Sequence, residues 1–234
     1  MPLMPNVLLA SLPRKAHQEV LSHCSEVTLA FGQLLYEHEQ PMLDVYFPQT
    51  CLISLMGVVD RDVALEVALV GREGMLGVPL ALGADLSPLR AIVPGEGVAL
   101  RMSKAHFLAA LRQHASLQRA IDGYSHALMA QIAQTAACNR FHPLNARLAR
   151  WLLMTRDRVG ASEFRVTQEF LSAMLGVRRV GVSEAASAFQ AQHLIEYSRG
   201  VIKILDHAGL EAACCSCYAL DAVRAGVLGS WRPV

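Results

Sequence analysis

Arg178 and Arg179 are adjacent arginines at the start of a stretch with helical apolar spacing. A guanidinium is a planar fork that can donate two hydrogen bonds to O6 and N7 of one guanine. Ser183 and Glu184 follow roughly one helical turn later, so they would share the same end of a helix. Side chains of these types at this spacing suit a helix end that enters a DNA major groove.

The element that would position these arginines is a pair of short helices within residues 167–189. Gly176 separates two apolar runs, and Thr167 can cap the first helix, with Gln168 and Glu169 as acceptors in its first turn. Two short helices joined at a glycine make a helix-turn-helix, although such pairs also occur in ordinary cores. The positions expected to face inward are Phe170, Leu171, Met174 and Leu175, then Val180, Val182, Ala185 and Phe189.

A β-hairpin is predicted directly downstream. Two strand-like runs, residues 194–197 and 201–205, are separated by Ser198, Arg199 and Gly200. A helix-turn-helix followed by a hairpin is a winged helix, and Arg199 at the tip would face phosphate. The predicted DNA contacts are Thr167, Gln168, Arg178, Arg179, Val180, Ser183, Ser198 and Arg199.

The charge distribution favours the same region. Residues 1–137 hold 9 Lys+Arg and 12 Asp+Glu, residues 138–205 hold 10 and 5, and the remainder holds 2 and 3, which gives the net charge of +1. Basic charge is thus concentrated where phosphate neutralisation would need it, and the acidic first half should not touch DNA.

Length and composition limit the number of domains and the class of protein. The 234 residues, 53% of them apolar, can form one large domain or two modest ones with a substantial core. No run reaches the ~18 uninterrupted apolar residues of a membrane span. The first residues carry no signal-peptide pattern, so a cytoplasmic protein is expected.

The six cysteines should be mostly reduced in a cytoplasmic protein. Cys214, Cys215 and Cys217 could offer soft ligands to zinc or another thiophilic metal. They lack a second Cys or His pair nearby at zinc-site spacing, so we expect small, partly buried thiols in a helix and no metal. The other cysteines are Cys24, Cys51 and Cys138.

The first half of the chain predicts a β domain after a helical lead-in over residues 1–30. From Phe31, short apolar runs alternate with Pro, Gly, Asp and Gln, a pattern typical of a sandwich or barrel. The predicted strands are residues 34–36, 45–47, 51–59, 63–70, 91–93 and 98–102.

From Ser103, a plausible cap, the pattern becomes helical and contains no proline until Pro143. An unbroken helix over 103–140 would outrun a small core, so its apolar seam is expected to pack against a second copy of the chain. The alternative is that this helix is buried across the β domain. The seam consists of Leu117, Ile121, Tyr124, Leu128 and Ile132.

The break at His142 and Pro143 marks a domain boundary. The next helix, residues 145–155, should turn Arg147 and Arg150 outward, and Asp206 should cap a last helix ending near Leu220. The inward positions of the first of these helices are Leu148, Trp151, Leu152 and Met154.

An enzyme is not indicated. The sequence has no Gly-x-Ser-x-Gly or Walker-type loop, and its histidines are not clustered with a carboxylate as a metal-dependent barrel requires. The alternative to DNA binding is an effector-binding or scaffold protein whose winged helix docks a protein partner.

The order of these elements resembles the Crp/Fnr family of bacterial transcription regulators. The likeness is carried by TQEFLSAMLGVRR (167–179), HLIEYSRGVIKILD (193–206), CNRFHPLNARLARWLL (138–153) and GREGMLG (71–77). It implies an α+β chain with four parts: an N-terminal β-roll (a jelly-roll-like, double-stranded β-helix sensor domain) over 1–102, a long dimerisation helix over 103–140, a winged helix-turn-helix over 141–220 and a loosely held tail over 221–234.

The family's partners would be a second copy and double-stranded DNA with two-fold symmetry, with RNA polymerase as a further candidate. Arg179 matches the guanine-reading arginine of the family, but Arg178 stands at the cap position and Val180 follows where many members have a glutamate. The operator should therefore differ from that of the cyclic-AMP regulators, and any small-molecule effector is unknown.

Cofactors of the family are not expected. Arg72 stands where cyclic-nucleotide-binding members have a glutamate, Glu73 is one residue late, Asp85 would repel phosphate and Arg90 comes too late. Cys24 and Cys51 are too few for a four-cysteine iron–sulfur cluster. Haem is given little weight, although His17, His23 and His38 are available.

Overall fold

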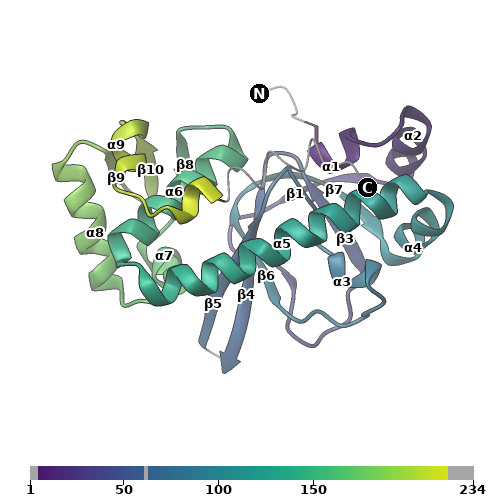
Figure 1. The fold of residues 1–234 in the computed structure, drawn as a ribbon, viewed down its shortest axis with the longest axis horizontal. Coiled ribbons are helices and arrows are strands. Elements are labelled where there is room, and N and C mark those ends of the chain that lie inside the picture. The colour runs from purple at the N-terminus through teal and green to yellow at the C-terminus, as the bar shows by residue number, and fades with distance from the viewer. Residues whose placement is uncertain (1–4, 61–62, 221–234) are drawn as a thin grey trace.

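The computed structural model describes residues 5–60 and 63–220. An N-terminal β domain occupies one half of the molecule, helical elements occupy the other, and the helix α5 runs along both (Figure 1). The first half contains α1 (Val7–Ala10), α2 (Arg14–Ser22), β1 (Ser25–Leu29), β2 (Leu34–Tyr36), β3 (Asp44–Pro48), β4 (Leu52–Asp60), β5 (Val63–Val70), α3 (Val78–Ala81), β6 (Arg90–Gly95) and β7 (Gly97–Ser103).

The β domain consists of two antiparallel sheets, ordered β1-β7-β3 and β2-β6-β4-β5. Alternate residues of the strands face a shared core, as with Val45 and Phe47 of β3, which are fully buried. Strand β1 corrects the predicted helical lead-in: only Leu29 of its residues is buried, and the strand pairs along its length with β7. The predicted strands of this half otherwise match β2 to β7 closely.

The predicted single helix over 103–140 is two helices, α4 (Lys104–Gln113) and α5 (Ala115–Phe141). Ser103 caps the first by accepting a hydrogen bond from the His106 amide at 3.4 Å. The break falls at His114, whose backbone is extended and whose Nε2 lies 2.9 Å from Glu19 Oε2 on α2. The break has no glycine or proline beside it, and the contact at His114 comes from a residue distant in the sequence. Local sequence signals therefore could not predict it.

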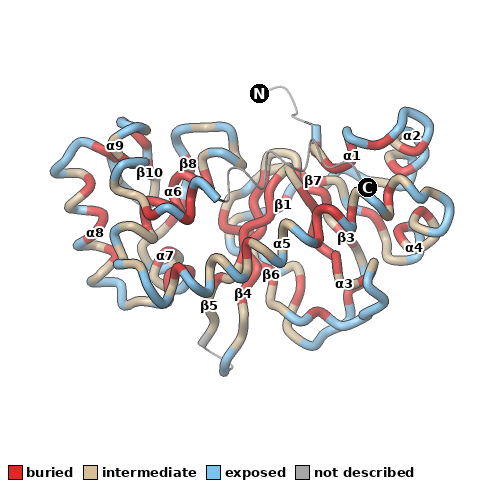
Figure 2. Tube along the Cα trace, viewed as in Figure 1, coloured by how far each residue is buried: buried red, intermediate tan, exposed pale blue. Residues whose placement is uncertain are grey.

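Three of the five residues predicted for the dimer seam are not available to a second copy. Leu117, Ile121 and Tyr124 are buried in the core of the β domain, and Leu128 and Ile132 pack against the same core. Figure 2 shows that buried, intermediate and exposed segments alternate along α5. A helical apolar stripe needs a partner, and here the partner is the chain's own β domain. The predicted alternative therefore holds for one face of α5, which packs across the β domain, while residues of the opposite face such as Met129 and Ala133 are exposed.

The second half contains α6 (Leu144–Val159), β8 (Glu163–Arg165), α7 (Gln168–Leu175), α8 (Arg179–Ala191), β9 (Ile195–Ser198), β10 (Val201–Ile204) and α9 (His207–Ala212). Asp206 caps α9 as predicted, accepting from the Gly209 amide at 3.0 Å, but α9 ends at Ala212 rather than near Leu220. The predicted tail, 221–234, lies outside the described residues. None of the described helices is long and apolar enough to cross a bilayer.

Helix α6 packs more deeply than its sequence predicts. Leu148, Trp151, Leu152 and Met154 are buried as expected. Arg150 and Arg147, expected outside, are buried and half-buried respectively. Arg150 donates from Nη2 to Thr135 Oγ1 of α5 at 3.1 Å, and Arg147 donates to the Leu175 carbonyl at the end of α7. Both arginines therefore join neighbouring helices instead of facing solvent.

Candidate nucleic-acid interface

Helix α7 begins where the sequence predicts. Thr167 Oγ1 accepts a hydrogen bond from the Phe170 amide at 3.1 Å, which satisfies one of the free amides of the first turn. Leu171, Met174 and Leu175 are buried. The helix ends at Gly176, whose φ of 62° is a left-handed conformation that glycine adopts without strain. The turn then leads directly into α8.

Helix α8 presents its first residues to solvent. Arg178, Arg179 and Val180 are exposed, while Val182, Ala185, Ala186 and Phe189 are buried. Val180 corrects the expected inward face: at 66% exposed it lies two residues before Val182, hence on the far side of the helix. Arg178 is the N-cap residue and makes no side-chain cap bond among the described residues. The start of α8 thus combines free amides, a positive dipole end and two guanidinium groups, which suits phosphate or base edges.

The wing is a three-stranded sheet ordered β8-β10-β9. Its tip is a two-residue turn in which Arg199 has φ 51° and Gly200 has φ 76°. Two positive φ values are the signature of a type I′ turn, which matches the twist of a tight hairpin. Ser198 and Arg199 are exposed at this tip. The predicted hairpin is therefore confirmed, and β8 extends it.

An open groove lies between the starts of α7 and α8 and the wing, and it unites half of the predicted contacts. Thr167, Gln168, Arg179 and Arg199 line it together with Tyr197 and Gly200. Arg178, Val180, Ser183 and Ser198 are not among these lining residues. Two arginines, Arg179 and Arg199, thus line one groove, and their guanidinium groups can donate hydrogen bonds to the phosphates and base edges of DNA.

Tyr197 is the functional candidate that sequence reasoning missed. Its hydroxyl donates to the Val166 carbonyl at 2.9 Å, and its amide donates to Gln190 Oε1 at 2.9 Å. Burial raises the pKa of the Tyr197 phenol, and the nearby Arg179 opposes this shift. The phenol therefore stays protonated, and its hydrogen bond to Val166 holds the side chain in place at the groove. The sequence signal that could have indicated Tyr197 is its position in the predicted strand that leads into the hairpin turn.

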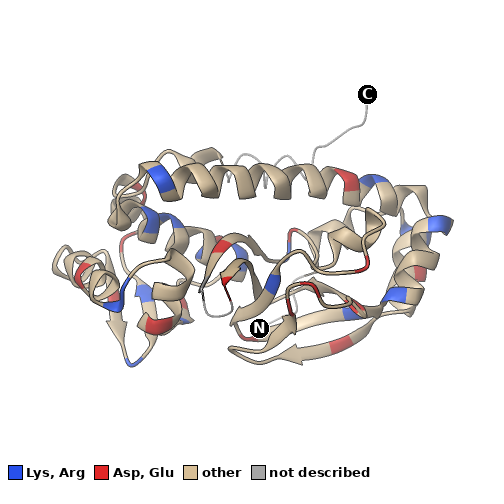
Figure 3. Cartoon of the chain, turned by 90° about the horizontal axis from the view of Figure 1, so that it is seen from below, with Lys and Arg blue, Asp and Glu red and all other residues tan. Residues whose placement is uncertain are grey.

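The winged helix carries several exposed basic residues, two of which, Arg179 and Arg199, line the groove. In the winged helix, Arg165, Arg178, Arg179, Arg199 and Lys203 are all exposed. Figure 3 shows basic residues of both halves, including those of the helix-and-wing end of the molecule. Other basic residues of this range make contacts inside the molecule: Arg150 with Thr135, Arg147 with the Leu175 carbonyl and Arg158 with Glu73. Part of the positive charge of residues 138–205 is therefore exposed on the winged helix, where it can attract phosphate.

The β domain contacts the winged helix through a buried carboxylate. Glu66 on β5 accepts from Ser54 Oγ at 2.6 Å and from Trp151 Nε1 of α6 at 2.9 Å. Burial raises the pKa of Glu66 to about 7, against the two hydrogen bonds that lower it. Ser54 Oγ also lies 3.1 Å from Met174 Sδ of α7. A titratable group therefore sits at the junction between the two halves.

The charged residues weighed above against a cyclic-nucleotide site make contacts within this chain. Glu73 Oε1 accepts from Arg158 Nε of α6 at 2.8 Å and from the Gly71 amide at 3.1 Å. Arg90 Nε donates to Glu37 Oε1 at 2.9 Å. Asp85 pairs with Lys104 at 2.8 Å. Glu73 thus ties the β domain to α6, at a second point of the junction.

The cysteines gather in a way the sequence did not predict. Cys138 of α5 and His142 at its C-cap lie beside Cys215 and Cys217, so the expectation that these last two lack a nearby Cys and His pair is wrong. Cys24 and Cys51 lie elsewhere, in or against the β-domain core.

A family model described as "Crp-like helix-turn-helix domain" matches residues 146–213. This range covers most of α6 and all of the helix-turn-helix and the wing, whose geometry is described above. Residues 146–213 are a Crp-like helix-turn-helix domain. A comparison with curated proteins gives no match.

Solved structures extend the likeness across both halves. A Crp/Fnr-family regulator of Eubacterium rectale is 16% identical at a TM-score of 0.62, covering 88% of this chain and 96% of its own. FixK2 from Bradyrhizobium japonicum is 15% identical at 0.65, with coverages of 82% and 98%. The c-di-GMP-responsive regulator CLP of Xanthomonas campestris is 15% identical at 0.66, with coverages of 83% and 100%. The chain therefore has the Crp/Fnr fold, and the predicted fold class and family resemblance are confirmed.

Proposed function

We propose that this chain acts as a homodimeric transcription regulator that reads a two-fold related operator with α8. The Crp-like domain makes DNA binding and transcription regulation its general function. The observation that carries the finer proposal is the exposure of Arg178 and Arg179 at the start of α8, beside the groove that Arg179 shares with the wing-tip Arg199. Arg179 reads a base edge, and Arg199 binds phosphate.

The dimer forms through the outer face of α5. With Leu117, Ile121 and Tyr124 committed to the core, the opposite face is exposed and rich in small residues. Alanines allow two helix backbones to approach closely, and Met129, 62% exposed, can fill the space between them. This face consists of Asp122, His126, Met129, Ala133, Ala136, Ala137 and Arg140.

A selection from random DNA tests this function. Sequences bound by the purified protein should converge on inverted repeats whose half-sites lie ~34 Å apart. Fluorescence anisotropy on the selected site, repeated at several salt concentrations, should show affinity falling steeply as salt rises. A winged helix that docks a protein instead would give no enriched repeat and no steep salt dependence on any DNA.

The β domain does not use a cyclic nucleotide as its effector. Glu73 and Arg90, the nearest matches to the ribose and phosphate ligands of relatives, have partners in Arg158 and Glu37. Calorimetric titration with cyclic AMP, cyclic GMP and c-di-GMP should give no saturable heat. Tight, saturable binding of any of the three would contradict this part of the proposal.

A further inference from the structure

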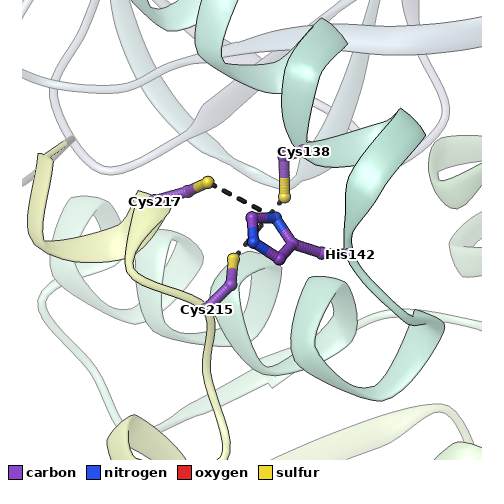
Figure 4. A group of neighbouring side chains, drawn as sticks. All are labelled: Cys138, His142, Cys215 and Cys217. Carbon is purple, nitrogen blue, oxygen red and sulfur yellow. Dashed lines mark hydrogen bonds between the residues drawn. The ribbon is translucent and has the colours of Figure 1, made fainter.

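Three cysteines and one histidine converge where α5 ends. Cys138 and His142 lie four residues apart and so share one face of the helix end, while Cys215 and Cys217 lie on the segment after α9. Their ligand atoms all lie within 4.8 Å of one another. Figure 4 shows the four side chains pointing toward one another.

The spacing of the donor atoms matches a tetrahedral zinc site. Zn–S bonds of about 2.3 Å and Zn–N bonds of about 2.0–2.1 Å give tetrahedron edges of about 3.8 Å between sulfurs and about 3.5 Å between sulfur and nitrogen. The Cys138 and Cys215 sulfurs are 3.6 Å apart, and Cys217 Sγ is 3.6 Å from His142 Nδ1. A disulfide would need its sulfurs at about 2.05 Å.

The surroundings are those of a closed site. All three cysteines are buried, and His142 is half-buried. Gln134 Nε2 donates to Cys217 Sγ at 3.0 Å, the type of hydrogen bond that orients a thiolate ligand. Cys214 packs against this cluster without belonging to the group of four donors, and its thiol donates to the Ala146 carbonyl at 3.8 Å. Four protein ligands leave no open position, which is the pattern of a structural rather than a catalytic zinc ion.

We propose that Cys138, His142, Cys215 and Cys217 bind one Zn²⁺ ion per chain. The donor set is three soft thiolates and one imidazole, which zinc prefers over hard cations. The ion would fasten the segment that follows α9 to the C-terminal end of α5. Because His142 immediately precedes Pro143 and α6, zinc would also fix the angle at which the Crp-like domain leaves α5.

Zinc content of the purified full-length protein tests the site directly. Mass spectrometry of the metals should find about one zinc per chain, and a Cys217→Ser variant should lose it, while Cys24→Ser should keep it. Cys24 is a matched control because it is half-buried in the other half of the chain. A Gln134→Ala variant should bind zinc roughly 10-fold more weakly, since it removes only the supporting hydrogen bond.

Cobalt supplies a second readout that does not depend on variant folding. Co²⁺ added to the metal-free wild-type protein should give a thiolate-to-cobalt charge-transfer band and tetrahedral ligand-field bands, and one equivalent of Zn²⁺ should abolish both. Absence of these bands, zinc retained equally by Cys217→Ser and Cys138→Ser, an iron chromophore, or a native mass two hydrogens lighter from a Cys138–Cys215 disulfide would each overturn the proposal.

The effect on DNA affinity rests on the proposed function and is measured separately. Removal of zinc by a chelator should weaken binding to the selected operator, and added Zn²⁺ should restore it. If the protein binds zinc but binds no operator, the proposed DNA binding is contradicted and the proposed zinc site is still supported. If operator affinity is the same with and without zinc, only the proposed role of zinc in fixing the angle between α5 and the Crp-like domain is contradicted.

Discussion

Replacing Glu66 with Gln should make the protein more stable at pH 8 than the wild type. Burial lifts the pKa of this carboxyl from 4.5 to about 7, so between these pH values the folded state holds a proton that the unfolded state has lost. At 1.36 kcal/mol per unit of pKa, the wild-type free energy of unfolding should fall by about 2–3 kcal/mol as pH rises from about 5 to 8. The amide of Gln cannot ionise and still fits the hydrogen bonds to Ser54 and Trp151.

Urea denaturation of both proteins at several pH values measures this difference. The wild-type curve should slope downward with rising pH, and the Glu66→Gln curve should be flatter by about 2–3 kcal/mol over the same range. Glu96→Gln, at an exposed turn between β6 and β7, is the control and should keep the wild-type slope. Equal slopes for wild type and Glu66→Gln would refute the assignment of this titration to the junction.

Three further changes test the elements that position the interface. Thr167→Ala removes the cap of α7 and should cost about 1 kcal/mol in thermal or urea unfolding, whereas Ser172→Ala, at a half-buried mid-helix site, should cost less. Gly176→Ala forces a side chain into a left-handed backbone and toward Leu65, and should cost about 1–2 kcal/mol; no loss would contradict the turn geometry. Ala133→Glu places a charge on the exposed face of α5 and should shift the dimer to monomer in analytical ultracentrifugation, while Ala105→Glu on α4 should not; an unchanged dimer would place the interface elsewhere.

The winged helix could be predicted because its signals are local. A capping threonine, a glycine at the turn and a glycine at the hairpin tip each specify backbone geometry within a few residues. The strands of the β domain could be predicted in the same way, because glycine, proline and polar residues separate the short apolar runs. Arg179 was accessible to the same reasoning, because exposed positions at a helix start follow from the buried ones, and Arg199 follows from its place at the hairpin tip.

The errors concern contacts between distant segments. Periodicity correctly predicted that Leu117, Ile121 and Tyr124 are buried, but it cannot tell a second chain from the chain's own β domain. Arg150 is drawn inward by Thr135 on another helix. Cys138 and Cys215 are 77 positions apart, so the Cys and His cluster emerges only when α5 and the segment after α9 are folded together.

The central claim is that Arg179 reads a base while Arg199 binds phosphate. The most direct test is anisotropy binding of Arg179→Ala and Arg199→Ala to the selected operator and to a panel of single-base variants, with the exposed Arg112→Ala as control. Arg179→Ala should lose roughly 1–3 kcal/mol on the operator and discriminate less at one base pair of each half-site, while Arg199→Ala should weaken all sequences about equally. Equal, sequence-independent losses from both variants, or operator binding that survives both, would contradict the account.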